Sequence, residues 1–328
     1  MTKTYDVVGI GNAIVDVLTQ SDDNFLELMG IEKGIMQLVE RERGEILYGA
    51  MKDRVQAPGG SVANTLAGLG NLGLRTGFIG RVHDDKLGRF YAEAMAADGT
   101  DFVNPPVARG DLPTSRSMIF VSPDGERSMN TYLGISSELG PDDVSDDVAG
   151  QAKILFLEGY LYDKPKGMEA FERAAQLTHA AGGLAGIALS DPFCVERHRP
   201  AFRRLVTELD YVIGNEHEWT SLYECDLDTA LAQAAKECKL VVCTRSGAPV
   251  LLIRDDERAE APVTRVTPVD ATGAGDQFAA GFLFGLATGR DLETCGRMGN
   301  VAAAEVISHF GARPEADLKA LFQAEGLL

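Results

Sequence analysis

The sequence predicts an α/β fold with a mostly parallel sheet and a second, smaller sheet. Apolar strand-like runs alternate with helical segments, as in the strand 153–159, the helix 166–182 and the strand 186–192. This alternation favours right-handed crossovers between parallel strands, with ligand groups at the carboxyl ends of the strands. Between residues 117 and 132 the apolar period changes to two around a Pro-Asp-Gly turn, which indicates a hairpin outside the parallel sheet.

The composition and charge exclude several classes of partner. Of the 328 residues, 45% are hydrophobic and 24% are charged, and the formal net charge is -18. Such an acidic chain repels nucleic acid and anionic membrane surfaces, so we expect neither as a partner. The five cysteines lack metal-site spacing, the first residues lack the long apolar stretch and small-residue cleavage site typical of a signal peptide, and no apolar run reaches membrane length. We therefore expect a cytoplasmic protein with reduced thiols.

The N-terminal residues predict a buried strand at 5–10, interrupted by Gly9-Ile-Gly11-Asn12 and resumed at 13–18. Gly-x-Gly after a first strand suggests dinucleotide binding, but the third glycine and the acidic residue after a second strand are missing. Further on, we expect a short helix ended by Gly30, a strand at 35–39 and a helix at 41–52.

A glycine pair, Gly59-Gly60, opens a helix of small residues that carries Ser61 and Asn64. Without side chains, the pair allows the backbone to approach a ligand closely, and Asn64 stands about one helical turn in. Tight packing against another helix is the alternative interpretation. The strand 76–80 and the helix 86–97 follow.

Two strands of the second half of the chain end in polar residues. The strand 211–214 is followed by Asn215 and Glu218, and the strand 240–243 by Thr244, Arg245 and a turn at Gly247. Polar side chains at the carboxyl ends of parallel strands are typical of a ligand site. For Glu218 the alternative is an acid in the first turn of a helix.

The stretch Pro268 to Asp276 is rich in glycine and leads into a helix with Phe278, Phe282 and Leu286 on one face. A helix that begins at a glycine turn offers unpaired N–H groups and a partial positive charge to an anion. A carboxylate there would repel a phosphate unless it takes a proton from the attacking group. We therefore interpret Asp276 as a general base, with a capped helix after a surface turn as the alternative.

These motifs resemble those of the ribokinase-like (PfkB) family of carbohydrate and nucleoside kinases. The stretch Asp270-Ala-Thr-Gly-Ala-Gly-Asp276 resembles one family signature, and Gly59-Gly60-x-x-x-Asn64 is similar to another. The resemblance extends over essentially the whole chain and implies a three-layer α/β/α ribokinase-like fold with a small β-sheet lid. We expect the core at 1–14, 54–112 and 134–328, and a discontinuous lid at 15–53 and 113–133.

The resemblance implies an ATP-dependent kinase that uses Mg²⁺, with K⁺ as an optional activator, and it assigns roles to individual residues. For catalysis these are Asp276 as base, the amides of Gly273, Ala274 and Gly275, and Arg127 of the hairpin on the transferred phosphate. For the acceptor they are Asn12, Asp16, Gly59, Gly60, Ser61 and Asn64. For the nucleotide they are Asn215, Thr244, Arg245, Gly247, Gly273, Gly275, Asn300 and Ala303. Asn215 and Glu218 would hold Mg²⁺ largely through water, and Asp270, Thr272 and carbonyls near 308–313 a monovalent cation.

One motif departs from the family pattern. The turn over the nucleotide phosphates usually reads Thr-x-Gly-x-x-Gly, whereas here Ser246 stands at the first glycine and Val250 near the second.

The insert 20–56 makes the chain look most like the adenosine kinase branch of the family. Met36 and Phe120, with other apolar lid residues, are expected to sandwich a purine, and ordinary lid packing is the alternative. We expect adenosine as the acceptor, giving AMP. The alternatives are a sugar kinase acting on ribose, fructose or 2-keto-3-deoxygluconate, and a non-catalytic sensor. The partners expected are ATP and a nucleoside or sugar, and the protein is expected to be a monomer or a homodimer through the lid.

Overall fold

A nine-stranded sheet forms the centre of the computed structural model, which describes residues 3–328. Its strand order is β14-β13-β12-β11-β10-β9-β1-β5-β6, and all neighbours from β12 to β6 are parallel. The strands β13 and β14 are antiparallel additions, so the predicted mostly parallel sheet is confirmed. The strands are β1 (Tyr5–Ile10), β5 (Thr76–Ile79), β6 (Thr100–Phe102), β9 (Ala152–Glu158), β10 (Leu184–Ala188), β11 (Tyr211–Asn215), β12 (Leu240–Arg245), β13 (Ala248–Arg254) and β14 (Glu257–Ala261).

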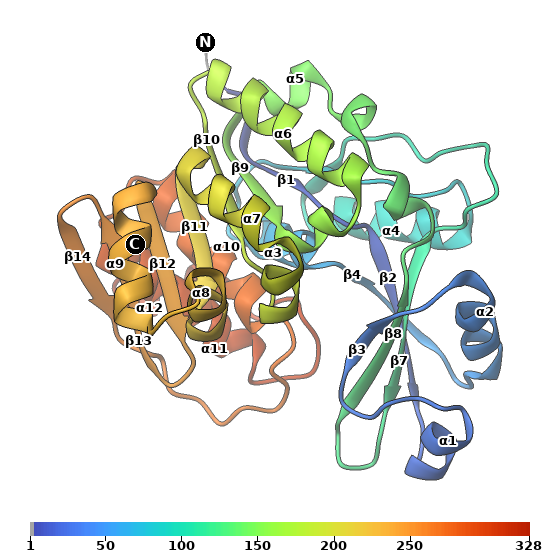
Figure 1. The fold of residues 1–328 in the computed structure, drawn as a ribbon. Coiled ribbons are helices and arrows are strands. Elements are labelled where there is room, and N and C mark those ends of the chain that lie inside the picture. Colours follow the sequence, from blue (N-terminus) through green and yellow to red (C-terminus); the bar gives the residue numbers. More distant parts are fainter. Residues whose placement is uncertain (1–2) are drawn as a thin grey trace.

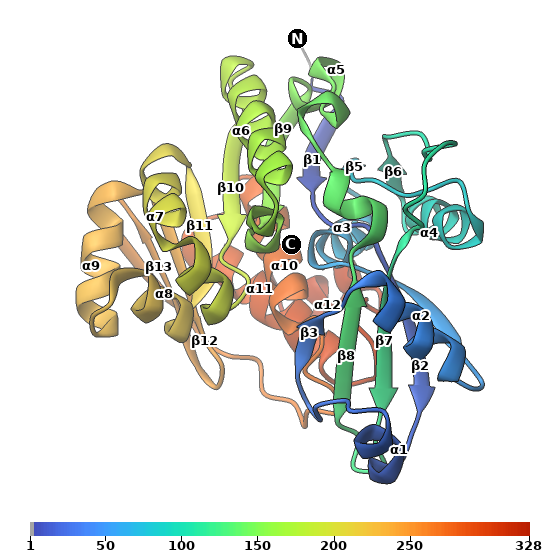
Figure 2. The same ribbon diagram turned by 45° about the vertical axis from the view of Figure 1, so that its right-hand side comes forward.

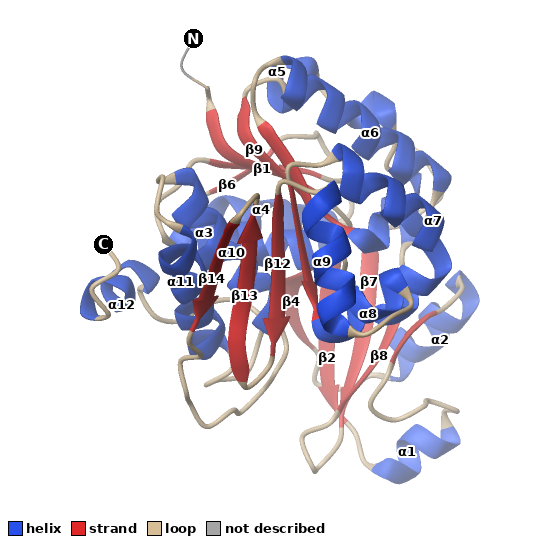
Figure 3. Ribbon diagram, turned by 60° about the vertical axis from the view of Figure 1, so that its left-hand side comes forward, coloured by secondary structure: helices blue, strands red, loops and turns tan. Residues whose placement is uncertain are grey.

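Helices cover both faces of this sheet and complete a three-layer α/β/α architecture (Figure 3). On one face lie α3 (Ser61–Asn71), α4 (Lys86–Ala97), α10 (Ala274–Ala287), α11 (Leu292–Val306) and α12 (Leu318–Ala324). On the other lie α5 (Asp146–Ala149), α6 (Pro165–Ala180), α7 (Pro192–Glu208), α8 (Glu216–Tyr223) and α9 (Leu227–Glu237). Short 3-10 turns occupy Gly134–Glu138, Pro141–Asp143 and Gly159–Asp163. Within residues 3–328, none of the helices combines the length and apolar character that a membrane span requires.

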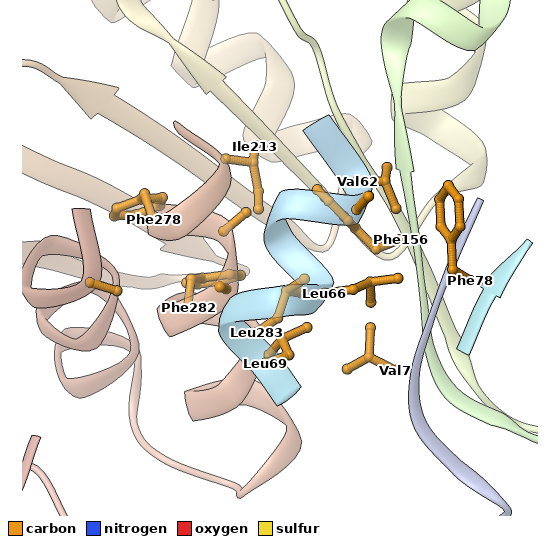
Figure 4. Packing of buried hydrophobic residues seen from close by; sticks show 14 of the residues in the cluster. Val7, Val62, Leu66, Leu69, Phe78, Phe156, Ile213, Phe278, Phe282 and Leu283 are labelled. Carbon is orange, nitrogen blue, oxygen red and sulfur yellow. The ribbon is translucent and has the colours of Figure 1, made fainter. Parts of the chain in front are cut away.

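Helix α3 is buried between the central sheet and α10. Figure 4 shows Val62, Leu66 and Leu69 of α3 between Leu283 of α10 and Val7 of β1, and all five side chains are fully buried. Burying each such aliphatic side chain stabilises the fold by about 1.5–3 kcal/mol. This packing holds the N-terminal turns of α3 and α10 close together, as the hydrogen bonds between them described below show.

The smaller sheet has the strand order β3-β8-β7-β2-β4 and projects from the central sheet (Figures 1 and 2). Its strands are β2 (Ile14–Gln20), β3 (Met36–Leu38), β4 (Val55–Gly59), β7 (Ser115–Val121) and β8 (Arg127–Tyr132). The predicted hairpin is present, because β7 and β8 pair antiparallel. The sheet also includes β4, which pairs with β2. The expected domain boundary at residue 54 had assigned the residues of β4 to the core. Its outer face packs against α1 (Asp23–Leu28) and α2 (Arg41–Ala50).

Candidate active site

A cavity of about 490 Å³ lies where the carboxyl ends of the parallel strands meet the smaller sheet. This volume is within the usual range for a small-molecule site. Residues at or near the ends of five central strands line it, together with the first turns of α3 and α10 and residues of the smaller sheet. From the strand ends these are Asn12, Glu158, Ala188, Asn215 and Thr244, and from the smaller sheet Ile14, Asp16, Met36, Leu38, Ser117, Met129 and Thr131.

The mouth of α10 opens into this cavity and depends on a glycine. Gly273 caps the helix with φ +79, and a Cβ there would lie 2.7 Å from Cα of Ala312. The first N–H groups of a helix lack intrahelical acceptors and therefore attract an anion. Of the three predicted amide donors, that of Ala274 donates to Ala271 O at 3.3 Å, near the limit for a hydrogen bond.

Asp276 lies in the first turn of α10 and is joined to the first turn of α3. Its carboxylate accepts hydrogen bonds from Ser61 Oγ at 2.7 Å and Asn64 Nδ2 at 3.0 Å. Burial raises the pKa of Asp276, while the bonds from Asn64 and Ser61 and the charge of Arg313 act in the opposite direction. An acid held in this way and exposed to the cavity is placed to accept a proton from a bound hydroxyl.

The glycine pair before α3 leaves room for groups of the neighbouring strand. A Cβ on Gly59 would lie 2.5 Å from the Asp16 carboxyl, and one on Gly60 would lie 2.4 Å from Asn12 O. Gly60 also has φ +93, which side-chain-bearing residues rarely adopt. The close approach predicted for this pair is therefore an approach to Asp16 and Asn12, at the wall of the cavity.

Asp16 is half-buried in β2 and faces the cavity. Burial raises the pKa of Asp16 to about 7. The positive charges of Arg313 and Arg127 lower this pKa, and the negative charge of Asp276 raises it slightly. No hydrogen bond to its carboxylate is formed by any residue from 3 to 328. An acid without protein donors at a cavity wall can accept hydrogen bonds from a ligand's hydroxyl groups.

Asn215 and Glu218 cap helix α8 reciprocally at the edge of the cavity. Glu218 accepts from Asn215 N at 2.8 Å and from Asn215 Nδ2 at 2.7 Å, and its own N–H donates to Asn215 Oδ1. Burial raises the pKa of Glu218 to about 7. Both residues line the cavity, and the remaining lone pairs of Glu218 can accept from metal-bound water, so this pair fits the indirect Mg²⁺ role expected of it.

Arg127 and Asp270 form an ion pair at 2.6 Å, and neither lines the cavity. Asp270 also accepts from Thr272 N and Oγ1, and from Gly311 N. Hydrogen bonds from Gly311 and Thr272 and the charge of Arg127 lower the pKa of Asp270 despite its partial burial. Both carboxylate oxygens of Asp270 therefore already have protein donors. Asp270 does not fit the monovalent-cation site that was expected at Asp270 and Thr272.

The residues expected to contact the nucleotide lie in several environments. Thr244 lines the cavity, whereas Arg245 Nε donates to Pro249 O and Gly247 faces open space. Asn300 is buried, donates to Ala261 O and Pro262 O, and lies outside the cavity together with Ala303.

The structure corrects the expected position of Phe120. Its side chain is fully buried and packs against Phe25 of α1, with ring centroids 5.7 Å apart. Because side chains alternate along a strand, Ser117 points to the cavity and Phe120 to the opposite face of the small sheet. Met36 does line the cavity.

Two residues of the site, Glu158 and Arg313, have at most a weak signal in the sequence. Glu158 accepts hydrogen bonds from Asn12 and Val62, and Arg313 lies near Asp16 and Asp276 and donates to Asn64 Oδ1. Glu158 ends a predicted buried strand, which is a weak signal for a ligand-site residue. Arg313 lies in a C-terminal loop without a motif of its own.

The fold and the placement of Asp276 at the mouth of α10 are those of a phosphotransferase that acts on an alcohol group. The family model described as pfkB family carbohydrate kinase matches residues 25–318, and the chain belongs to this family. The adenosine kinase from Sinorhizobium meliloti is 46% identical, with 98% of this chain and 99% of that chain covered and a TM-score of 0.90. A probable sugar kinase from Rhizobium etli CFN 42 is 42% identical over 100% of both chains, with a TM-score of 0.92. A 5-dehydro-2-deoxygluconokinase from Shouchella clausii is 26% identical, with 93% of this chain and 90% of the relative covered.

Proposed function

We propose that this protein is an adenosine kinase, which transfers the γ-phosphate of ATP to the 5′-hydroxyl of adenosine and gives AMP and ADP. The observation that carries the proposal is the position of Asp276. Its carboxylate is in the first turn of α10, held by Ser61 and Asn64 of the acceptor motif, in the wall of a cavity that also contains Asp16. One acid is thus beside the expected phosphate site, and the other is free to bind ribose hydroxyls.

In this mechanism the bond from the acceptor oxygen to the γ-phosphorus forms while the bond from that phosphorus to the leaving oxygen of ADP breaks. Asp276 accepts the proton of the attacking hydroxyl. The N–H groups at the mouth of α10 stabilise the charge on the transferred group, and Arg127, which is paired with Asp270 outside the cavity lining, is proposed to add positive charge from there. Mg²⁺ bound with ATP, near Asn215 and Glu218, would neutralise phosphate charge. Thr244, in the cavity wall, is proposed to contact the nucleotide, and Arg245, Gly247, Asn300 and Ala303 are proposed to contact the part of it that extends beyond the cavity.

A purine acceptor is supported by the apolar part of the cavity. Met36 and Leu38 of β3, Met129 of β8 and Leu133 line it beside Asp16. Apolar side chains at both sides of a flat ring bury its faces, whereas a bare sugar requires polar partners. The similarity to the adenosine kinase from Sinorhizobium meliloti supports the same acceptor.

A sugar acceptor is the second candidate, and one feature of the lining favours it. Ser117 and Thr131 place hydroxyl groups in the cavity, although these two bond to each other at 2.9 Å. The similarity to a 5-dehydro-2-deoxygluconokinase also supports a sugar.

An acceptor panel distinguishes the two candidates. ADP release with Mg-ATP should be measured with adenosine, inosine, ribose, fructose, 2-keto-3-deoxygluconate and 5-dehydro-2-deoxygluconate, and with Asp276→Asn as the background control. The proposal expects kcat/KM for adenosine to exceed that for every sugar. A sugar as the best acceptor would contradict the choice of adenosine and leave the phosphotransfer intact.

We propose that the protein is a monomer and not a homodimer formed through the small sheet. The outer face of the small sheet is already covered, because Met118 and Phe120 are buried against α1 and α2. Light scattering during gel filtration should give the mass of one 35.2 kDa chain. Twice that mass would support a dimer.

A further inference from the structure

Glu158 is a buried acid in the wall of the cavity to which the mechanism above gives no role. It is the last residue of β9 and is 2% exposed. Oε1 accepts from the backbone N of Asn12 at 3.0 Å and from its Nδ2 at 2.9 Å, and Oε2 accepts from Val62 N at 3.1 Å. Burial raises the pKa of Glu158, while these same bonds oppose the rise. One carboxylate thus joins three segments that are distant in sequence.

Helix α3 needs a cap from outside its own chain segment. It begins after Gly60, whose φ of +93 and whose proximity to Asn12 O exclude a capping side chain at that position. The N–H of Val62, in the first turn, donates to Glu158 instead. A carboxylate at this end of a helix is also favoured by the helix dipole. Glu158 therefore supplies the cap that Gly60 cannot provide.

The same carboxylate fixes the orientation of Asn12. The backbone N–H and one amide hydrogen of Asn12 point to Oε1 of Glu158, and Oδ1 of Asn12 accepts from Ser136 Oγ at 2.8 Å. These three bonds assign the amide orientation and hold it in one rotamer. Asn12 lines the cavity, so its fixed amide is part of the cavity wall.

We infer that Glu158 is a positioning residue of the acceptor site. It holds Asn12 directly, and by capping α3 it fixes Ser61 and Asn64, the two side chains that bind the Asp276 carboxylate. The inference rests on the proposed function of this cavity. Both oxygens of Glu158 already accept protein donors, so its contribution is exerted through Asn12 and α3.

The test is Glu158→Gln, which keeps the shape and removes an acceptor. With the best acceptor of the panel, kcat/KM for the acceptor should fall about 10- to 100-fold, since hydrogen bonds to a buried charged group are lost. The KM for Mg-ATP should change less than about twofold, because the hydrogen-bond partners of Glu158 are Asn12 and Val62, and neither is assigned to the nucleotide. If the substitution only lowered the stability of the protein, the concentration of active enzyme would fall and both KM values would stay unchanged.

Hydrogen exchange followed by mass spectrometry tests the cap without any substrate. In Glu158→Gln, peptides that cover residues 58–66 should exchange faster than in the wild type. Asp210→Asn is the matched control, because Asp210 is also a buried acid that accepts a backbone N–H, that of Ala185, but lies at the amino end of β11. This control should leave exchange at 58–66 and both KM values unchanged.

Wild-type exchange at 58–66, or a wild-type kcat/KM for the acceptor, would overturn the inference. If Glu158→Gln does not fold, Ser136→Ala tests the orientation of Asn12 separately from the cap of α3. This variant should raise the acceptor KM without changing the KM for Mg-ATP. An unchanged acceptor KM in that variant would overturn the inference as well. If no compound of the panel is phosphorylated, the proposed function fails, whereas the exchange experiment still decides the role of Glu158.

Discussion

The guanidinium of Arg127 lies 2.6 Å from the carboxylate of Asp270 and joins the small sheet to the loop before α10. Both side chains are largely buried, with 13% and 9% of their areas exposed. We expect Arg127→Gln to reduce kcat/KM about 10- to 100-fold, because the contact between the small sheet and the loop before α10 is lost together with the positive charge proposed to act on the transferred phosphate. Steady-state kinetics should compare it with Arg75→Gln, which removes an exposed ion pair with Asp6. Equal kinetics for the two variants would argue against both roles of Arg127.

Monovalent cations should have little effect on turnover. Asp270, the side chain expected to bind one, is already neutralised by Arg127 and accepts three further hydrogen bonds. Rates in potassium and tetramethylammonium chloride at equal ionic strength should agree within about twofold, because a charge-assisted pair satisfies the carboxylate. A large activation by potassium would mean that Arg127 leaves Asp270 in the active state.

Removal of the proposed base should abolish chemistry and spare nucleotide binding. We expect Asp276→Asn to lower kcat by about 10²- to 10⁴-fold, since a general base typically contributes that much. The Kd for Mg-ATP, measured by calorimetry, should stay near its wild-type value. Asp291→Asn is the control, because Asp291 caps α11 and asparagine caps equally well. Turnover close to wild type in Asp276→Asn would remove this residue from the reaction.

Asp16 predicts a pH dependence of both activity and stability. Its folded-state pKa of about 7 lies above the ordinary value of 3.8, so the folded protein holds a proton that the unfolded chain releases. Stability therefore falls as the pH rises from about 4 to about 7, and the penalty is complete above that range. At pH 8 we expect Asp16→Asn to be more stable than the wild type, on the order of 1–3 kcal/mol, and at pH 4 equally stable.

The activity should change with pH in the opposite direction to the stability. The ionised carboxylate of Asp16 accepts at both oxygens, whereas protonation turns one oxygen into a donor, so kcat/KM for the acceptor should rise with pH through about 7. In Asp16→Asn the rate should be low at every pH, without this inflection. A wild-type profile that is flat between pH 6 and 8 would contradict the assignment.

Two glycines should respond in opposite ways to the same substitution. Gly60→Ala places a Cβ 2.4 Å from Asn12 O at a residue with φ +93, and should lower the free energy of unfolding by about 2–4 kcal/mol. Gly49→Ala, in helix α2 with open space around it, should raise it by about 0.5–1 kcal/mol. Urea denaturation measures both, and comparable effects would show that the contact with Asn12 is relaxed.

The sequence predicted the parallel sheet, the hairpin and the strand-end position of the site, because these follow from local periodicity and from connection rules. The direction of Phe120 was missed because Ser117 to Val121 is apolar on both faces, and only the docking of α1 decides which face is covered. Glu158 and the ion pair of Arg127 with Asp270 could not be predicted, because their partners lie far away in the chain and the contacts exist only after packing.

The hydrogen bond from Ser61 to Asp276 spans 215 positions of the chain. During synthesis Ser61 therefore leaves the ribosome long before α10, which carries Asp276. Under the proposed function, a polypeptide that ends before α10 would have the acceptor side of the cavity but no base, and would not split ATP.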